Sequence, residues 1–216
     1  LYIDLITKVN DISVTYRTSG EIIFKDNTKL ELEDDFSWNG RYYVYGYGKF
    51  QGSRTQLESA ITLAYDTYGT VVDSNSKLVW KRYRSTQASI DGIVPVTSGD
   101  SIVNAVVAVS NYLGADFNAV SYMEQGHTAV ETFDNISGVH GISLTGITYE
   151  KALSYVGDGS PVIARIGEDE YIIITAYNSS EIAYIEASTG AQKTVSMNEA
   201  GKMFSQGGNI YVTYYK

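Results

Sequence analysis

The segment that most constrains the fold is GDSIVNAVVAVSNYLGAD, residues 99–116. Its apolar residues recur at helical spacing and form one continuous face, made of Ile102, Ala105, Val106, Val109 and Leu113. A helix with such a face has to be buried against another layer of structure. Asp100 stands just before it, where a helix N-cap is expected. We therefore expect a core helix that starts near Asp100.

The residues before this helix are predicted to form mainly strands. Within residues 41–83, a capping box at Thr55 and Glu58 predicts one helix, with strand-forming segments before and after it. This pattern predicts a βαββ unit. The glycine-containing stretch GYGKFQG in front of the helix is interpreted as a bulge or loop, because its spacing differs from that of a dinucleotide-binding motif. Further upstream, three more strand-forming segments are ISVTYR, EIIFK and TKLELE.

A domain boundary is predicted just before the core helix. Residues 85–99 are polar and contain serine and glycine, apart from the short apolar piece IDGIVPV. The prediction is therefore a β-rich N-terminal region over residues 1–95 and a second domain over residues 96–216.

The second domain is predicted to place helices first and an antiparallel sheet afterwards, which makes it α+β. A capping box at Thr128 and Glu131 starts one further helix, and residues 148–156 form another. Ser196 and Glu199 cap a last helix. The strand-forming segments of this domain are PVIAR, YIIITAY, EIAYIEA and NIYVTYY.

Composition excludes several classes of function. The 216-residue chain has a net charge of −9, and its longest basic cluster is KRYR at residues 81–84. Nucleic acid and anionic membrane surfaces are therefore not expected as partners. No apolar run is long enough to span a membrane. The absence of cysteine excludes a disulfide scaffold, a thiolate nucleophile and a cysteine-ligated metal.

The same composition favours an extracellular location. A chain without cysteine and with only two prolines is typical of many secreted or surface proteins of Gram-positive bacteria. The nineteen tyrosines indicate strands with many half-buried or exposed aromatic positions. The first residue is Leu1 rather than Met, so we expect a processed mature form or an excised fragment of a secreted or cell-surface protein.

Four segments in the last half of the chain carry a family resemblance in their order: SIVNAVVAVSNYLGA, ITYEKALSYVGDGSPVIARI, YIIITAYNSSEIAYIEASTG and MNEAGKMFSQGGNIYVTYY. Together they resemble the papain-like cysteine peptidases, and among these the bacteriocin-processing (double-glycine) peptidases and related domains of bacterial surface proteins. The resemblance implies helices packed on an antiparallel sheet. The phrases VYGYG and VVD…LVW also resemble a segment that precedes such domains in clostridial surface proteins.

The resemblance implies where a catalytic site would lie. A papain-like peptidase needs a thiolate at a helix N-terminus, an imidazole that activates it, an orienting Asn or Asp and an oxyanion donor. In this chain the nucleophile position falls at Ser101, the imidazole position at Tyr171 and the orienting position at Glu186. The stretch VPVTSGD before Ser101 contains no Gln that could serve as the oxyanion donor.

These substitutions predict a pseudo-enzyme. A serine hydroxyl is a poor nucleophile without a base, and Tyr171 cannot act as that base near neutral pH. A lone Cys-to-Ser change at Ser101 would fit an engineered inactivation, whereas the loss of the His and Gln as well indicates natural decay. The competing structural interpretations are that Ser101 caps the helix, that Tyr171 packs on the sheet and that Glu186 accepts hydrogen bonds at a turn.

The remaining candidate residues predict no metal and no cofactor. His127 and His140 both stand in glycine-containing segments, QGHT and GVHG, and are interpreted as surface loop residues because they lack metal-site spacing. The acidic run ELEDD at residues 31–35 lacks the alternating pattern of a calcium loop and is interpreted as a solvated hairpin face.

Three functions are compatible with these features. The first is a non-catalytic peptidase-like module that binds a protein partner or assembles with itself, for example through the apolar segment LYIDLI at residues 1–6. The second is a module that binds cell-wall polysaccharide through exposed Tyr or Trp side chains such as Tyr45 and Tyr47. The third is a hydrolase with a rearranged site, in which Ser101 works with His127 or His140.

Overall fold

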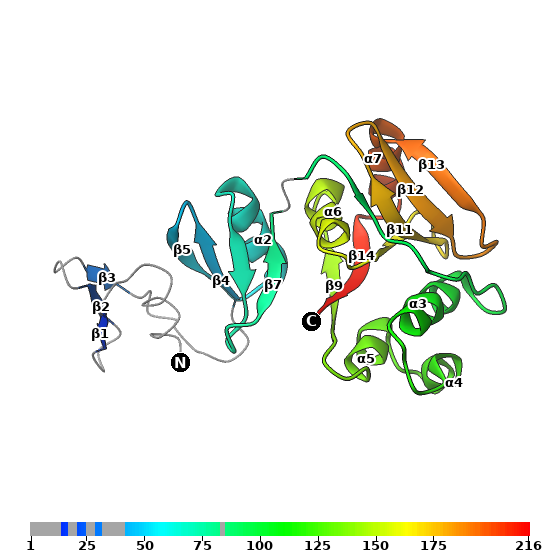
Figure 1. Cartoon of the computed structure of the whole chain (residues 1–216), viewed down its shortest axis with the longest axis horizontal. Helices are drawn as coiled ribbons and strands as arrows, with labels where there is room; N and C mark the ends of the chain where they lie inside the picture. The colour runs from blue at the N-terminus through cyan, green and yellow to red at the C-terminus, as the bar shows by residue number, and fades with distance from the viewer. Residues whose placement is uncertain (1–13, 17–20, 25–28, 32–41, 83–84) are drawn as a thin grey trace. The chain divides into compact units, whose positions relative to one another are not determined.

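The computed structural model describes residues 14–16, 21–24, 29–31, 42–82 and 85–216, and the segment LYIDLI and residues 32–35 of the acidic run lie outside them (Figure 1). The chain divides into two compact units, Leu1–Leu78 and Val79–Lys216. The domain boundary predicted between residues 95 and 96 stays a prediction.

The first unit begins with a small antiparallel sheet. Its strands β1 (Val14–Tyr16), β2 (Glu21–Phe24) and β3 (Lys29–Glu31) pair in the order β1-β2-β3. Each strand lies within one of the three upstream segments that the sequence predicts to be extended, so those predictions are confirmed.

A second sheet has four described strands, and one helix stands between its second and third strands along the chain. Two strands come before the helix and two after it, and the sheet order is β5-β4-β6-β7. The stretch GYGKFQG contains the tight turn at Tyr47-Gly48 and a β-bulge at Gln51, as predicted, but it also supplies most of the strand β5, so the predicted βαββ pattern lacks one strand. The elements are β4 (Tyr42–Gly46), β5 (Lys49–Arg54), α2 (Leu57–Asp66), β6 (Thr70–Val72) and β7 (Leu78–Lys81).

The predicted capping box of α2 is wrong. Gln56 is the N-cap, and its side chain makes no capping hydrogen bond. The reason is that β5 continues to Arg54, which pairs with Tyr42, so the chain enters the helix too late for Thr55 to cap it. The helix is held instead by its apolar face, in which Leu57, Ala60, Ile61 and Ala64 are buried.

The second unit contains an antiparallel sheet in the order β13-β12-β11-β10-β14-β9. Strand β11 also pairs with the short strand β8, beyond the residues that pair with β10. A β-bulge at Thr175 interrupts the pairing of β11 with β12 at the same point. The strands are β8 (Ala88–Ser89), β9 (His140–Thr145), β10 (Val162–Arg165), β11 (Tyr171–Tyr177), β12 (Glu181–Glu186), β13 (Gln192–Ser196) and β14 (Ile210–Tyr215).

Helices pack around this sheet, as Figure 1 shows. The helices α3 and α6 both contact β11, whereas α5 contacts β9 and β14, and α7 contacts β12 and β13. The helices are α3 (Ser101–Tyr112), α4 (Ala119–Glu124), α5 (Ala129–Asp134), α6 (Tyr149–Gly157) and α7 (Met197–Gln206). The predicted core helix and its continuation into helices and an antiparallel sheet are thereby confirmed.

Local sequence signals explain most of these helix boundaries. The capping boxes of α5, at Thr128 and Glu131, and of α7, at Ser196 and Glu199, are both present. The sequence analysis missed α4, whose N-cap Asn118 accepts a hydrogen bond from the Ser121 amide. It also missed β9, so His140 begins a strand and does not lie in a loop.

The core of the second unit is centred on β11. Ile172, Ile173 and Ile174 follow one another in this strand and are all at most 1% exposed. Because successive side chains of a strand point to opposite faces, the sheet is covered on both faces at this position. The start of β11, where Tyr171 lies, is therefore fixed in place beside helix α3.

Candidate functional site

The structure brings Ser101 and Tyr171 into contact. Ser101 is the first residue of α3 and is 9% exposed. Its hydroxyl donates a hydrogen bond to the Tyr171 carbonyl oxygen at 3.2 Å and accepts one from the Tyr171 amide at 2.9 Å. The positions that the family resemblance pairs are thus neighbours, but they meet through the backbone of β11.

In this arrangement the Ser101 hydroxyl uses its proton and one lone pair in hydrogen bonds to the backbone of Tyr171. A hydroxyl nucleophile needs a base within reach that can take its proton, and an amide carbonyl oxygen is not such a base. Asp100 occupies the N-cap position, as expected, but its side chain makes no capping hydrogen bond. Ser101 therefore links the N-terminus of α3 to strand β11 through hydrogen bonds.

Asn104, one turn along α3, holds the start of the helix against the loop that follows β12 and was not predicted from the sequence. It is 1% exposed, and its carboxamide donates to the carbonyl oxygens of Gly99 at 2.7 Å and Ala187 at 3.0 Å. It also accepts a hydrogen bond from the Gly99 amide at 2.8 Å. The signal that could have revealed it is a polar residue within the apolar run IVNAVVAV, since a buried amide needs partners.

The carboxylate of Glu186, at the end of β12, is hydrogen-bonded within the hairpin of β12 and β13. Its carboxylate accepts hydrogen bonds from the Lys193 ammonium at 2.5 Å and from the Thr189 hydroxyl at 2.8 Å. These bonds, led by the one from Lys193, hold the pKa of the Glu186 carboxyl below its ordinary value, and the same pair raises the pKa of Lys193. The geometry matches the interpretation of Glu186 as an acceptor at a turn.

The two histidines make contacts elsewhere. The His127 ring stacks on Tyr122 with 3.8 Å between ring centroids, and its Nδ1 lies 3.9 Å from the Glu131 carboxylate. His140 stacks on Tyr215 at 5.0 Å. Within the described ranges, no group of three His, Asp or Glu side chains could hold a metal ion.

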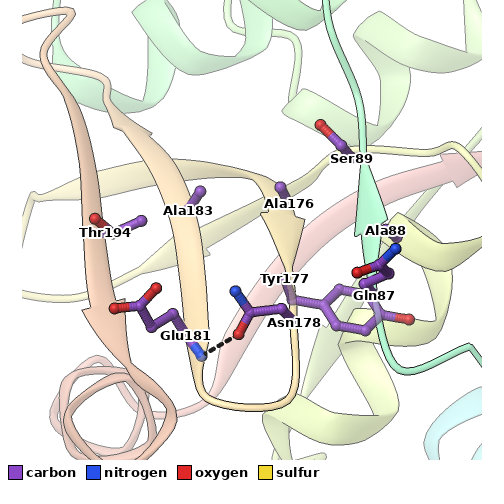
Figure 2. A pocket seen from close by; sticks show the side chains of 9 residues that line it. All are labelled: Gln87, Ala88, Ser89, Ala176, Tyr177, Asn178, Glu181, Ala183 and Thr194. Carbon is purple, nitrogen blue, oxygen red and sulfur yellow. Dashed lines mark hydrogen bonds between the residues drawn. The ribbon is translucent and has the colours of Figure 1, made fainter.

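A cavity of about 530 Å³ lies on the sheet near the other end of β11 (Figure 2). Its floor is a row of small side chains across four strands, since Ser89 pairs with Ala176, Ala176 with Ala183, and Ala183 with Thr194. Figure 2 shows these four side chains on the same side of the sheet. The other lining residues are Gln87, Ala88, Tyr177, Asn178 and Glu181.

A second cavity of about 220 Å³ continues the first one. It shares Ser89, Ala176 and Ala183 with the first cavity, is walled by residues 90–93 and ends at Gln192 and Lys193. We call the two cavities together the sheet groove. Its far end therefore reaches the lysine that pairs with Glu186.

The exposed tyrosines proposed to bind sugar lie in the first unit. Tyr45 is half-buried and packs against Phe50 with 5.6 Å between ring centroids. Tyr47, in contrast, is 67% exposed. Only one of the two tyrosines named from the sequence is therefore open to a ligand.

Comparison with known proteins identifies the fold. No protein family model matches the chain, and no curated protein matches it. A crystal structure from Bacillus anthracis, described as that of a candidate C39-like peptidase, is similar with a TM-score of 0.50 and 11% sequence identity. The match covers 61% of this chain and 98% of that one. The part of the chain that the match covers has a papain-like, C39-like fold.

This likeness confirms the fold that the sequence resemblance implies. At 11% identity it concerns the fold alone, and the roles of Ser101, Tyr171 and Glu186 stay predictions. Among the described residues, every helix is too short or too polar to cross a membrane.

Proposed function

We propose that the C39-like fold serves here as a non-catalytic module of a secreted or cell-surface protein, which binds a protein partner and does not cleave it. One observation carries the proposal: the Ser101 hydroxyl is bonded to the amide and the carbonyl of Tyr171, at the place where the family resemblance implies a nucleophile and an imidazole. Neither backbone group of Tyr171 is a base that could accept the proton of the hydroxyl.

The described contacts of the other candidate bases support the proposal. Glu186 is engaged with Lys193 and Thr189. His127 is stacked on Tyr122, and His140 is stacked on Tyr215. Activation of Ser101 would require one of these side chains to leave its partners and also to displace Tyr171 from the hydroxyl.

Among the described residues, the sheet groove offers a surface suited to a partner. Small side chains on its floor allow a polypeptide backbone to approach the sheet closely, and the rim offers hydrogen-bonding groups at Gln87, Asn178 and Glu181. The groove runs across four strands, which suits an extended segment of a protein partner better than a compact small molecule.

The absence of catalysis is tested by peptidase assays. Wild-type protein is incubated with unfolded casein and with peptides that contain a Gly-Gly sequence, and no cleavage is expected. The variants are Ser101→Ala and a control, Ser110→Ala, which removes a buried hydroxyl of the same helix. Cleavage that is lost in Ser101→Ala and retained in Ser110→Ala would overturn the proposal.

Binding is tested with a displayed library of random extended peptides. Ala183→Arg fills the floor of the groove, and Ala115→Arg is the matched control, because both alanines are half-buried in the second unit. Peptides selected on the wild type should bind Ala115→Arg equally and Ala183→Arg at least tenfold more weakly. Selected peptides that bind both variants equally would contradict the groove as the site. Sedimentation of the wild type at high concentration tests the alternative of self-assembly.

A further inference from the structure

Two tyrosines of the first unit form an exposed aromatic pair. Tyr47 lies in the turn between β4 and β5, and Tyr68 follows the C-cap of α2. Their side chains are 67% and 51% exposed, and their ring centroids are 6.1 Å apart with 44° between the ring planes. We call these two residues the tyrosine pair.

Both residues have left-handed backbone conformations, with φ of 51° at Tyr47 and 52° at Tyr68. Tyr47 and Gly48 (φ 75°) are the two central residues of a tight hairpin turn, where Asn-Gly is the favoured sequence. Tyr68 stands in a Schellman motif, in which the Gly69 amide bonds the Ala64 carbonyl at 2.7 Å, and glycine or asparagine is favoured there. Local stability therefore does not explain a tyrosine at either position.

Two glycines hold the tyrosine pair together. A Cβ atom on Gly46 would collide with the side chain of Thr67, and one on Gly69 would collide with the Tyr45 carbonyl oxygen. The hairpin turn and the helix end are thus in direct backbone contact, which brings the two rings side by side. The Tyr47 hydroxyl also donates a hydrogen bond to the Asp66 carbonyl oxygen at 3.3 Å.

We propose that the tyrosine pair is a binding site for neutral polysaccharide, with sugar rings stacked on the two aromatic faces. A pyranose ring has one face of C–H groups, which an aromatic ring covers well, and hydroxyls that nearby polar groups can bond. Asp66, exposed at the end of α2, provides such a group. A Cβ atom on Gly48 would meet nothing within 4 Å, so the described residues leave this side open for an extended chain.

Size and charge favour a neutral glycan over other occupants. Two tyrosine side chains expose far less than the roughly 800 Å² that each partner of a stable protein complex buries. The net charge of −9 opposes nucleic acids and polyanionic polymers, which would otherwise suit aromatic stacking. The tyrosine pair lies in the first unit and does not depend on the function proposed for the C39-like fold.

The test uses the full chain and two insoluble neutral probes, chitin and cellulose. Tyr47→Asn and Tyr68→Asn remove one ring each and place a residue better suited to the left-handed backbone. Ser76→Gly is the control, because it relieves a left-handed residue (φ 63°) of the same unit without removing a ring. Unfolding midpoints of all three variants should equal or exceed that of the wild type.

We expect retention on at least one probe, a loss of roughly tenfold in each tyrosine variant and no loss in Ser76→Gly. No retention of the wild type on any probe, or retention that survives both tyrosine variants, would overturn the proposal. A proline-rich peptide column is run in parallel. Binding to that column alone, lost in the same variants, would assign the tyrosine pair to peptide recognition and would also overturn it.

Discussion

Two serines of helix α3 show how the same residue type can have opposite effects. Ser101 bonds two backbone groups of Tyr171, whereas the hydroxyl of Ser110, also buried, has no hydrogen-bond partner among the described residues. A buried hydroxyl stabilises a protein only when it is bonded, because its hydration is lost on folding. The two serines should therefore respond differently to the same substitution.

Ser101→Ala is expected to lower the free energy of unfolding by about 1–3 kcal/mol. The Tyr171 carbonyl oxygen keeps the Ala187 amide at 3.1 Å, but the Tyr171 amide loses its acceptor. Ser110→Ala should change the free energy of unfolding by about 0.5 kcal/mol or less, or stabilise the protein. Urea denaturation of both variants measures the difference, and equal losses would contradict it.

Tyr214 makes the protein sensitive to alkali. Burial raises the pKa of this phenol to about 12, and the side chain is 1% exposed. Because the unfolded chain releases the proton near pH 10, the stability that this group contributes is complete below pH 10 and is lost as the pH rises towards 12. Tyr214→Phe should reduce this loss without removing it, because burial also raises the pKa of Tyr211 above its ordinary value. Denaturant midpoints across the range test this, with tyrosinate absorbance as the readout of ionisation.

Among the elements, the hairpin of β12 and β13 is joined by the Glu186–Lys193 pair at its turn. Because the pKa of Glu186 is lowered in the folded state, its contribution to stability is present above the ordinary carboxyl pKa and is lost as the pH falls through the folded value. Thr189 supports the same carboxylate and would remain after the loss of Lys193.

Lys193→Met is expected to raise the pKa of Glu186 towards its ordinary value, since the largest cause of the shift is removed. Carboxyl chemical shifts of Glu186, followed by NMR through an acid titration, measure the change. Thr189→Ala provides the comparison and should raise the pKa less, because its hydroxyl is the smaller cause. A titration unchanged in Lys193→Met would show that the pair does not form in solution.

Elements with clear local signals were predictable from the sequence, including the strands in PVIAR and NIYVTYY, whereas β5 and β9 were not predicted. Helix α3 and the capping boxes of α5 and α7 depend on residues within a few positions of each other. Strand β9 pairs over six residues with β14, which lies far along the chain, and its local signal is short, because only Ile142 and Leu144 alternate with polar residues. The β5 strand was missed because glycine at Gly52 breaks the usual strand pattern while pairing still holds it.

The location of the candidate site was predictable from the sequence, but the hydrogen bonds of its residues were not. Segment order predicted that Ser101 and Tyr171 would be neighbours, yet residue types could not reveal that the hydroxyl bonds the backbone of Tyr171. Only Tyr47 of the tyrosine pair was named from the sequence, because Tyr68 lies in a different segment of the chain. The signal available was a tyrosine directly before a glycine at both places, Tyr47-Gly48 and Tyr68-Gly69.

At the scale of the whole molecule, net charge decides which polymers the chain can approach. A chain with a charge of −9 is repelled by teichoic acid and nucleic acid, and this repulsion weakens as salt is added. Retention on a neutral polysaccharide should therefore hardly change between low and high salt. Binding measured on neutral and anionic polymers over a salt series tests this. Tight binding to the anionic polymer at low salt would contradict it.

The bulge at Thr175 has a consequence for how this fold can diverge. Below the bulge, β11 pairs with β10 and its first residue is tied to helix α3; above it, β11 pairs with β8 and lines the sheet groove. Since the register shifts between the two halves, a substitution in the upper half need not be transmitted to the lower one. Substitutions in the sheet groove are therefore expected to leave the contact between Ser101 and Tyr171 in place.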